Sequence, residues 1–362
     1  MNLRVPGPTP LPDQVREATA AEMINHRGPE FRELLSSIVA DLQHFFQTAN
    51  EIEIVTGSGT GGMEAAIVNL ISPGDRVVAV SIGAFGDRFV DIARAFGAEV
   101  TVVAAPWGRA ADPLALERAL AQTPDVRLVL VTHNETSTGV TNDLRTLAEV
   151  VRGRPEETRP LLVVDAISSA GSIPLLTDDW GCDVVIGGSQ KGWMAPPGLA
   201  MLSVSNRAWA AMERATCPRL YWDLRAARRY AERGQTPWTP AVGVLYGLRA
   251  GLRLMRAEGR EAIYARHRRV ANRMREGAAS LGLELFADPA YASDTVTTLR
   301  VPAGWDGEAL VARMRERGVV ISGGQGKLKG QVIRVGHLGH VDTADIEQVL
   351  SALAAVLREK VS

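Results

Sequence analysis

From about residue 51 to residue 187 the chain alternates short β-branched runs with longer segments of helical period, and this order constrains the fold most. The runs are mostly apolar, as expected of parallel strands whose two faces are both covered by helices. We expect strands at 51–56, 76–80, 98–103, 126–132, 161–165 and 183–187, and crossover helices at 61–71, 85–97 and 144–153. The sequence therefore predicts an α/β domain with a large, doubly wound, mostly parallel sheet.

The remainder of the chain differs in composition and in the order of its predicted helices and strands. Segments rich in Ala, Arg and Leu extend from about residue 205 to residue 281, and they are followed by predicted strands at 294–302, 319–322 and 332–336 and helices at 307–317 and from about residue 342. This order indicates a smaller C-terminal α+β domain. We expect a proline-rich, extended N-terminal arm over residues 1–20, a large domain over residues 21–258 and a small domain over residues 259–362.

Composition argues against several function classes. The 362 residues include 40 Lys plus Arg and 41 Asp plus Glu, so the net charge of −1 favours neither nucleic acid nor an anionic membrane. No apolar run approaches the roughly 18 residues of a membrane helix. Cys182 and Cys217 are not spaced like metal ligands. His337 and His340 have no acidic or cysteine residue near them at the spacing that a metal site needs. We expect a soluble cytoplasmic protein with no metal, nucleic-acid or membrane partner.

A glycine-rich loop, TGSGTGGMEAA at 56–66, follows the first strand and opens a helix. Ser58, Gly59 and Thr60 can offer backbone N–H groups and hydroxyls to an anion, and the helix dipole favours negative charge there. The loop also matches the dinucleotide pattern G-x-G-x-x-G, but the next strand ends in Ser81 instead of an acid that would hold a ribose. A phosphate site is predicted, with a nicotinamide dehydrogenase or a purely structural glycine turn as alternatives.

Later strand ends carry four more side chains of chemical interest. Phe85 is placed to cover a planar ring, and the Thr136 hydroxyl to reach a ring substituent. Asp165 closes a buried strand, where its carboxylate either caps a turn or keeps a heteroaromatic nitrogen protonated. Burial of Lys191 would lower the pKa of its amine, which suits a nucleophile that forms an imine. Because the carboxyl ends of parallel strands share one edge, this set is typical of a pyridoxal phosphate site.

These motifs resemble the class V aminotransferases of fold type I, in particular the alanine–glyoxylate and serine–pyruvate aminotransferase group. The resemblance runs nearly end to end and rests on PGPTPLP (6–12), TGSGTGGMEAAIVNLISPGD (56–75), THNETSTGV (132–140), VDAISSAGSIPL (164–175), GSQKGWMAPPG (188–198) and VIRVGHLG (332–339). Its most specific part is Asp165 followed about 26 residues later by Ser-Gln-Lys.

The resemblance implies how the cofactor, pyridoxal 5′-phosphate, is bound. Lys191 would form the internal aldimine and shuttle a proton between substrate and cofactor, and Asp165 would pair with the pyridine nitrogen. The other matching positions would contact the ring (Phe85), its hydroxyl (Thr136) and the phosphate (Ser58, Gly59, Thr60 and Gln190). Some relatives have Trp or Tyr in place of Phe85 and His in place of Thr60.

The resemblance also implies the substrate and the assembly. Arg334 would bind the substrate carboxylate through its guanidinium fork, and Gly7 would line a narrow site for small amino acids. Thr239 would reach the phosphate in the neighbouring subunit, which implies a homodimer with shared active sites. The expected activity is a ping-pong transamination from a small amino acid, such as alanine or serine, to glyoxylate or pyruvate.

Alternatives within and outside the fold remain. A phosphoserine-type aminotransferase would use cations such as Lys327 and Lys329, and an aspartate-type aminotransferase is also compatible with the motifs. A cysteine desulfurase is disfavoured, because the stretch before Arg334 contains no cysteine. Some relatives carry the name of a hydrogenase subunit, so an accessory binding subunit is the alternative from another class. The sequence assigns no role to Asn25, His26 and Arg27.

Overall fold

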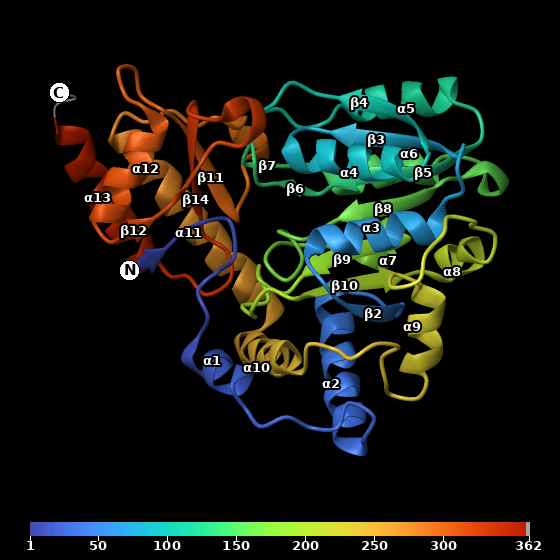
Figure 1. Ribbon diagram of the computed structural model, residues 1–362. Coiled ribbons are helices and arrows are strands. Elements are labelled where there is room, and N and C mark those ends of the chain that lie inside the picture. Colours follow the sequence, from blue (N-terminus) through green and yellow to red (C-terminus); the bar gives the residue numbers. More distant parts are fainter. Residues whose placement is uncertain (360–362) are drawn as a thin grey trace.

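The computed structural model describes residues 1–359 and is built around a seven-stranded sheet (Figure 1). The strand order is β2-β10-β9-β8-β5-β3-β4. The bounds are β2 (Glu51–Thr56), β3 (Arg76–Ser81), β4 (Glu99–Ala104), β5 (Val126–Thr132), β8 (Leu161–Asp165), β9 (Val184–Gly188) and β10 (Leu199–Val204). All strands but β10 coincide with predicted runs, and the predicted large, mostly parallel sheet is confirmed.

Strand β10 was not predicted. It lies between β2 and β9 and is antiparallel to both, with Leu199 opposite Thr56 and Ala200 opposite Gly188. All six of its residues are buried. Because β10 brings the chain back across the sheet after β9, the loop between these two strands is held at the sheet edge where Lys191 lies.

Helices cover both faces of the sheet. Alternate residues of β3 belong to different cores: Val78 and Val80 pack in one, and Val77 and Ala79 in the other. The large-domain helices are α2 (Pro29–Phe46), α3 (Gly59–Leu70), α4 (Ala84–Ala95), α5 (Pro113–Gln122), α6 (Leu144–Arg152), α7 (Thr177–Trp180), α8 (Asn206–Met212), α9 (Leu224–Ala231) and α10 (Val242–Glu258). The predicted crossover helices correspond to α3, α4 and α6, whereas α2, α5 and α7 were not predicted.

The C-terminal part forms the predicted small α+β unit, seen in orange and red in Figure 1. Its elements are α11 (Arg260–Ser280), β11 (Val296–Arg300), α12 (Gly307–Glu316), β12 (Val319–Val320), β13 (Ser322–Gly323), β14 (Val332–Gly336) and α13 (Thr343–Arg358). Strands β11, β14 and β13 form an antiparallel sheet. The single strand predicted at 319–322 is instead two short strands, β12 and β13, in different sheets. We propose the domain boundary between residues 258 and 259, where α10 ends.

The N-terminal segment is only partly extended. Strand β1 (Asn2–Leu3) pairs in parallel with β12 in the small unit, and α1 (Asp13–Thr19) packs against α10 with Val15 fully buried. The expectation of an extended arm is therefore wrong for residues 13–19. The segment between β1 and α1 runs from the small unit to α1 beside α10 (Figure 1). Within residues 1–359, no helix has the length and apolar character needed to cross a bilayer.

Candidate active site

The strand ends of the large sheet surround one open pocket of about 490 Å³. It is lined by Ser58, Gly59, Thr60, Met63, Phe85, Arg88, Asn134, Thr136, Asp165, Ile167, Ser168, Gln190 and Lys191. The structure thus brings together all the predicted site residues except Gly7, Thr239 and Arg334. They meet because β2, β3, β5, β8 and β9 all end at the same edge of the sheet.

The glycine-rich loop forms the N-terminus of α3 at one side of the pocket. The Ser58 side chain caps this helix by accepting a 3.3 Å hydrogen bond from the N–H of Gly61. A Cβ atom at Gly59 would lie 2.6 Å from Cδ1 of Ile167, so only glycine fits here without displacing that wall of the pocket. The first N–H groups of a helix have no partner within it, so this end is suited to an anion.

Two buried polar side chains at the pocket suit a polar ligand. The Oε1 atom of Gln190 is buried without a hydrogen-bond partner among the described residues. Asp165 is only 4% exposed, and its Oδ1 accepts a 3.0 Å hydrogen bond from the N–H of Ile167. Buried polar groups are normally paired, so such a site fits a ligand with its own polar groups.

Burial perturbs both ionisable groups that the sequence placed here. Burial raises the pKa of Asp165 to about 7, although the hydrogen bond from Ile167 opposes this change. Burial lowers the pKa of Lys191 to about 8; the attraction of Asp165 opposes this shift, and the positive charge of Arg334 adds to it. The amine of Lys191 is therefore much closer to neutral at physiological pH than that of a surface lysine.

The N-terminal segment lies directly against Lys191. The Nζ atom of Lys191 donates a 2.6 Å hydrogen bond to the carbonyl of Pro6. A Cβ atom at Gly7 would lie 2.7 Å from Nζ. Gly7 also has a φ of +134°, a backbone conformation that residues with a side chain rarely adopt. Thr9 completes the contact, because its N–H donates to the carbonyl of Gln190 and its hydroxyl to that of Lys191. Gly7 thus lies beside the lysine, although it does not line the pocket.

Arg334 contacts the wall of the pocket from the small domain. It lies on β14, is 7% exposed, and its Nη1 donates a 3.2 Å hydrogen bond to the carbonyl of Thr136. Its Nε donates to the carbonyl of Gly323 and its Nη1 also to Gln325. Burial lowers the pKa of Arg334 to about 10, and Glu135 opposes this effect. Within residues 1–359 no carboxylate forms an ion pair with it, so its charge is available to an anionic ligand.

Thr239 lies elsewhere. It is exposed in the loop before α10 and does not line the pocket of its own chain. The same loop is held by Arg27, whose Nη1 donates a 2.6 Å hydrogen bond to the carbonyl of Thr236. Nearby, the rings of Tyr221 and Trp238 stack with centroids 6.0 Å apart, and both are partly exposed.

The sequence did not identify the residue that positions Phe85. The buried carboxylate of Glu135 accepts 3.0 Å hydrogen bonds from the N–H groups of Phe85 and Gly86, and its other oxygen accepts from Ser137. Burial raises the pKa of Glu135, and these hydrogen bonds oppose that change. Glu135 therefore fixes the N-terminus of α4 and with it the ring that faces the pocket.

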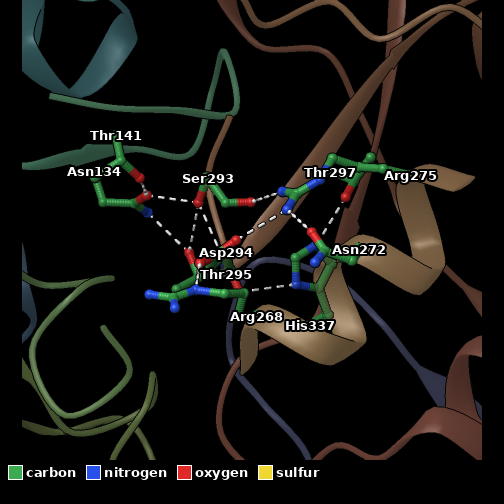
Figure 2. Close-up of polar contacts among 10 residues, drawn as sticks. All are labelled: Asn134, Thr141, Arg268, Asn272, Arg275, Ser293, Asp294, Thr295, Thr297 and His337. Atoms are coloured by element: carbon green, nitrogen blue, oxygen red, sulfur yellow. Dashed lines mark hydrogen bonds and ion pairs between the residues drawn. The ribbon is translucent and has the colours of Figure 1, made fainter. Parts of the chain in front are cut away.

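Asn134 was also not assigned a role. Its Oδ1 accepts from the hydroxyls of Thr141 and Ser293, at 2.7 and 2.6 Å, and its Nδ2 donates to those of Ser168 and Thr295, at 2.8 and 2.9 Å. Figure 2 shows this network continuing through the small domain to Asp294, Arg275 and His337. One side chain thus joins the pocket wall to the segment that enters β11, the strand beside Arg334.

His337 belongs to this network. Its Nε2 lies 2.8 Å from the hydroxyl of Thr297 and its Nδ1 3.2 Å from the carbonyl of Asp294. Both ring nitrogens are therefore engaged in the small-domain core.

Comparison with known proteins agrees with this geometry. The family model for aminotransferase class V matches residues 3–349. An L-aspartate–glyoxylate aminotransferase of Paracoccus denitrificans is 40% identical, with 94% of this chain and 87% of that protein covered. A protein of Synechococcus sp. named soluble hydrogenase, small subunit, is 42% identical, with 99% and 93% covered.

Among solved structures, an alanine–glyoxylate aminotransferase of Nostoc sp. superposes with a TM-score of 0.94. It is 34% identical, and the match covers 99% of this chain and 95% of that one. A fold type I arrangement is thereby established, and the family implies pyridoxal phosphate as cofactor. The chain belongs to the class V aminotransferase family and is a transaminase of the pyridoxal-phosphate-dependent type.

Proposed function

We propose that this enzyme transfers the amino group of a small amino acid to glyoxylate or pyruvate by a ping-pong mechanism. The observation that carries the proposal is the convergence of Asp165, Lys191 and Phe85 on one pocket, with Arg334 bonded to its wall. These groups supply an acid, an amine, an aromatic face and a carboxylate receptor, which are the parts that amino-group transfer through pyridoxal phosphate requires.

The residues present fit this cofactor. Ser58, Gly59, Thr60 and Gln190 would hold its phosphate, Phe85 and Thr136 its ring, and Asp165 its ring nitrogen. Bound there, pyridoxal phosphate supplies an aldehyde carbon and an electron-withdrawing ring that stabilises a carbanion at the substrate Cα. Gln190 would donate to the phosphate through its Nε2 amide, because its Oε1 can only accept a hydrogen bond. The absence of a side chain at Gly59, where a Cβ would meet Ile167, supports this assignment.

Each of the two ionisable residues then has a defined task. Asp165 would keep the ring nitrogen protonated, and a cation placed beside it would lower the pKa of its carboxyl below the present value. Lys191, with a pKa of about 8, has an amine that can lose and regain a proton near physiological pH. Its Nζ would accept the proton from the substrate Cα and pass it to the cofactor C4′. In the second half-reaction it would move a proton in the opposite direction, from C4′ to the carbon that was the keto carbon of the acceptor.

The substrate would be oriented by its carboxylate. Arg334 offers a guanidinium without an acidic partner in the described chain, and a bidentate pair would fix the direction of the substrate Cα–H bond. Gly7 and the carbonyl of Pro6 crowd the space around Nζ, which favours short substrate side chains.

The identity of the amino donor has less support than the identity of the acceptor. The Paracoccus relative is named for aspartate and glyoxylate, whereas relatives from Methylorubrum extorquens and Hyphomicrobium methylovorum are named serine–glyoxylate aminotransferases. Glyoxylate is thus the acceptor with most support, and aspartate is a second candidate donor. A panel of alanine, serine and aspartate against glyoxylate and pyruvate tests the proposal, and a marked preference for aspartate would contradict its small-donor part.

One structural observation and one assay bear on the remaining alternatives. Lys327 and Lys329 are exposed and do not line the pocket, so a phosphoserine substrate has little support. An accessory hydrogenase subunit would have no use for the perturbed Lys191. The accessory-subunit alternative is contradicted if the purified protein catalyses glyoxylate-dependent loss of an amino donor.

We also propose a cytoplasmic homodimer in which Thr239 completes the partner's phosphate site. The exposed stack of Tyr221 and Trp238 near that loop supports a buried partner contact. Mixing inactive Lys191→Ala chains with inactive Thr239 variants should restore one working site per mixed dimer. No recovery on mixing, despite exchange of subunits, would contradict shared sites.

A further inference from the structure

The proposed phosphate site lacks a charge-neutralising residue. Ser58, Gly59, Thr60 and Gln190 are all uncharged, whereas a phosphate monoester carries about two negative charges near neutral pH. The N-terminus of a helix contributes the equivalent of only about half a positive charge. Because a partly buried anion without a counter-charge is costly, a cation is expected beside these four residues.

Arg88 is placed to be that cation. It lies on α4 one turn after Phe85, lines the same pocket, and its Nη1 donates a 3.1 Å hydrogen bond to the hydroxyl of Thr60. Its guanidinium carbon lies 4.7 Å from the centroid of the Phe85 ring. The Thr60 hydroxyl and the Phe85 face thus hold the guanidinium at the N-terminus of α3.

The charge of Arg88 is not used elsewhere in the described chain. No carboxylate of residues 1–359 forms an ion pair with it, whereas Arg4 and Arg275 each pair with an aspartate. Of the residues that line the pocket, Lys191 is the other cation, and its Nζ is directed to the carbonyl of Pro6. A half-buried guanidinium with free donors and no acidic partner is a receptor for an oxyanion.

We propose that Arg88 is the cationic member of the phosphate site and binds the phosphate group of the cofactor beside Thr60. The inference rests on the proposed pyridoxal phosphate cofactor and deepens it. It assigns Thr60 a second task, because the Thr60 hydroxyl orients the guanidinium that supplies the charge. The positive charge of Arg88 also acts on Lys191 and Asp165, lowering the pKa of each.

The test compares two ligands that differ only in the phosphate. Protein freed of cofactor is titrated with pyridoxal phosphate and with pyridoxal, and binding is followed by absorbance and by quenching of tryptophan fluorescence. The variants are Arg88→Met, Arg88→Lys and the control Arg94→Met, which changes an exposed arginine on the same helix. None of these readouts requires catalysis.

The expected result is specific to the phosphate. Arg88→Met should weaken the binding of pyridoxal phosphate by roughly 10- to 100-fold, the size of a lost charge-assisted hydrogen bond, and leave the binding of pyridoxal unchanged. Arg88→Lys should recover part of the loss, because lysine binds phosphate as a point charge. Arg94→Met should behave like the wild type. Inorganic phosphate should raise the unfolding temperature of the wild type more than that of Arg88→Met.

Other results would overturn the inference. Equal losses for both ligands would mean that Arg88 only supports the Phe85 ring, and unchanged binding of both would remove it from the site. If both ligands bind Arg88→Met normally and a separate steady-state measurement shows a raised KM for the amino donor, Arg88 belongs to the substrate site instead. If the wild type itself binds neither ligand, the proposed cofactor fails and the inference fails with it, which the wild-type titration alone reveals.

Discussion

The amine of Lys191 and the carbonyl of Pro6, 185 positions apart in sequence, are joined by a 2.6 Å hydrogen bond. The N-terminal segment thereby forms one wall of the space around the reactive amine. The same segment is anchored at both ends, by β1 on the small domain and by α1 on α10. The position of the amine thus depends on the packing of a segment that is remote in sequence.

Gly7→Ala tests this dependence. The added Cβ would lie 2.7 Å from Nζ of Lys191, so the segment or the lysine must move, and we expect activity to fall about 100-fold. Gly304→Ala is the matched control, because Gly304 also has a positive φ but a Cβ added there would have no neighbour within 4 Å. Steady-state kinetics and thermal unfolding of both variants provide the measurement. Equal activity losses in the two variants would show that backbone strain, not the contact with Lys191, is responsible.

The pKa of Lys191 gives a pH prediction. Only the neutral amine attacks an aldehyde, and burial lowers the pKa of this amine from 10.5 to about 8. The rate at which cofactor-free protein captures pyridoxal phosphate at Lys191 should therefore rise with pH and reach half its maximum near pH 8. Borohydride trapping and peptide mass spectrometry measure it, with exposed Lys329 as the internal reference. A half-maximum near pH 10.5 would contradict the burial argument.

The large sheet was predictable in most of its strands because buried parallel strands are continuous apolar runs. Strand β10 was not, since it follows the Pro196–Pro197 pair and no pattern reveals that the strand returns antiparallel. Helix α1 was hidden by the prolines around it, although Val15 anchors its apolar face. The local pattern of apolar residues therefore identified most strands. The direction of a strand and the packing of a helix depend on residues that are distant in sequence, which a local pattern does not reveal.

Candidate site residues could be predicted from the sequence where they lie at the carboxyl ends of strands. Asp165 and Lys191 could be placed together because the carboxyl ends of parallel strands share an edge. Arg88 could have been found from its position one turn after Phe85, on the same face of a helix. Asn134 could not, because its partner Ser293 lies 159 residues away in the other domain. The relevance of Gly7 came from family resemblance alone.

Asp165→Asn should separate cofactor binding from catalysis. The amide keeps the shape of the side chain but cannot hold the ring nitrogen protonated through a negative charge. We expect the cofactor to bind and kcat to fall about 100- to 1000-fold, as when one electrostatic stabiliser of a transition state is lost. Asp91→Asn, an exposed change on α4, is the control. A kcat close to that of the wild type would remove Asp165 from the proposed mechanism.

Arg334→Lys tests the carboxylate receptor. A lysine keeps the charge but loses the bidentate fork, so we expect KM for both amino donor and glyoxylate to rise roughly 10- to 100-fold, with an unchanged cofactor spectrum. The wild type should also discriminate strongly between alanine and alaninamide, and the variant much less. Arg300→Lys on the neighbouring strand serves as the control. Equal discrimination by wild type and Arg334→Lys would place the carboxylate elsewhere.

Lys191 is the residue proposed to hold the cofactor covalently. The most direct measurement is the visible absorbance of the protein with pyridoxal phosphate, before and after borohydride, combined with peptide mass spectrometry. The wild type should show a visible band that borohydride abolishes, and the reduced cofactor should be attached to the peptide that contains Lys191. Lys191→Ala should show neither. A wild-type protein that stays colourless after addition of pyridoxal phosphate would contradict a covalent link between Lys191 and the cofactor.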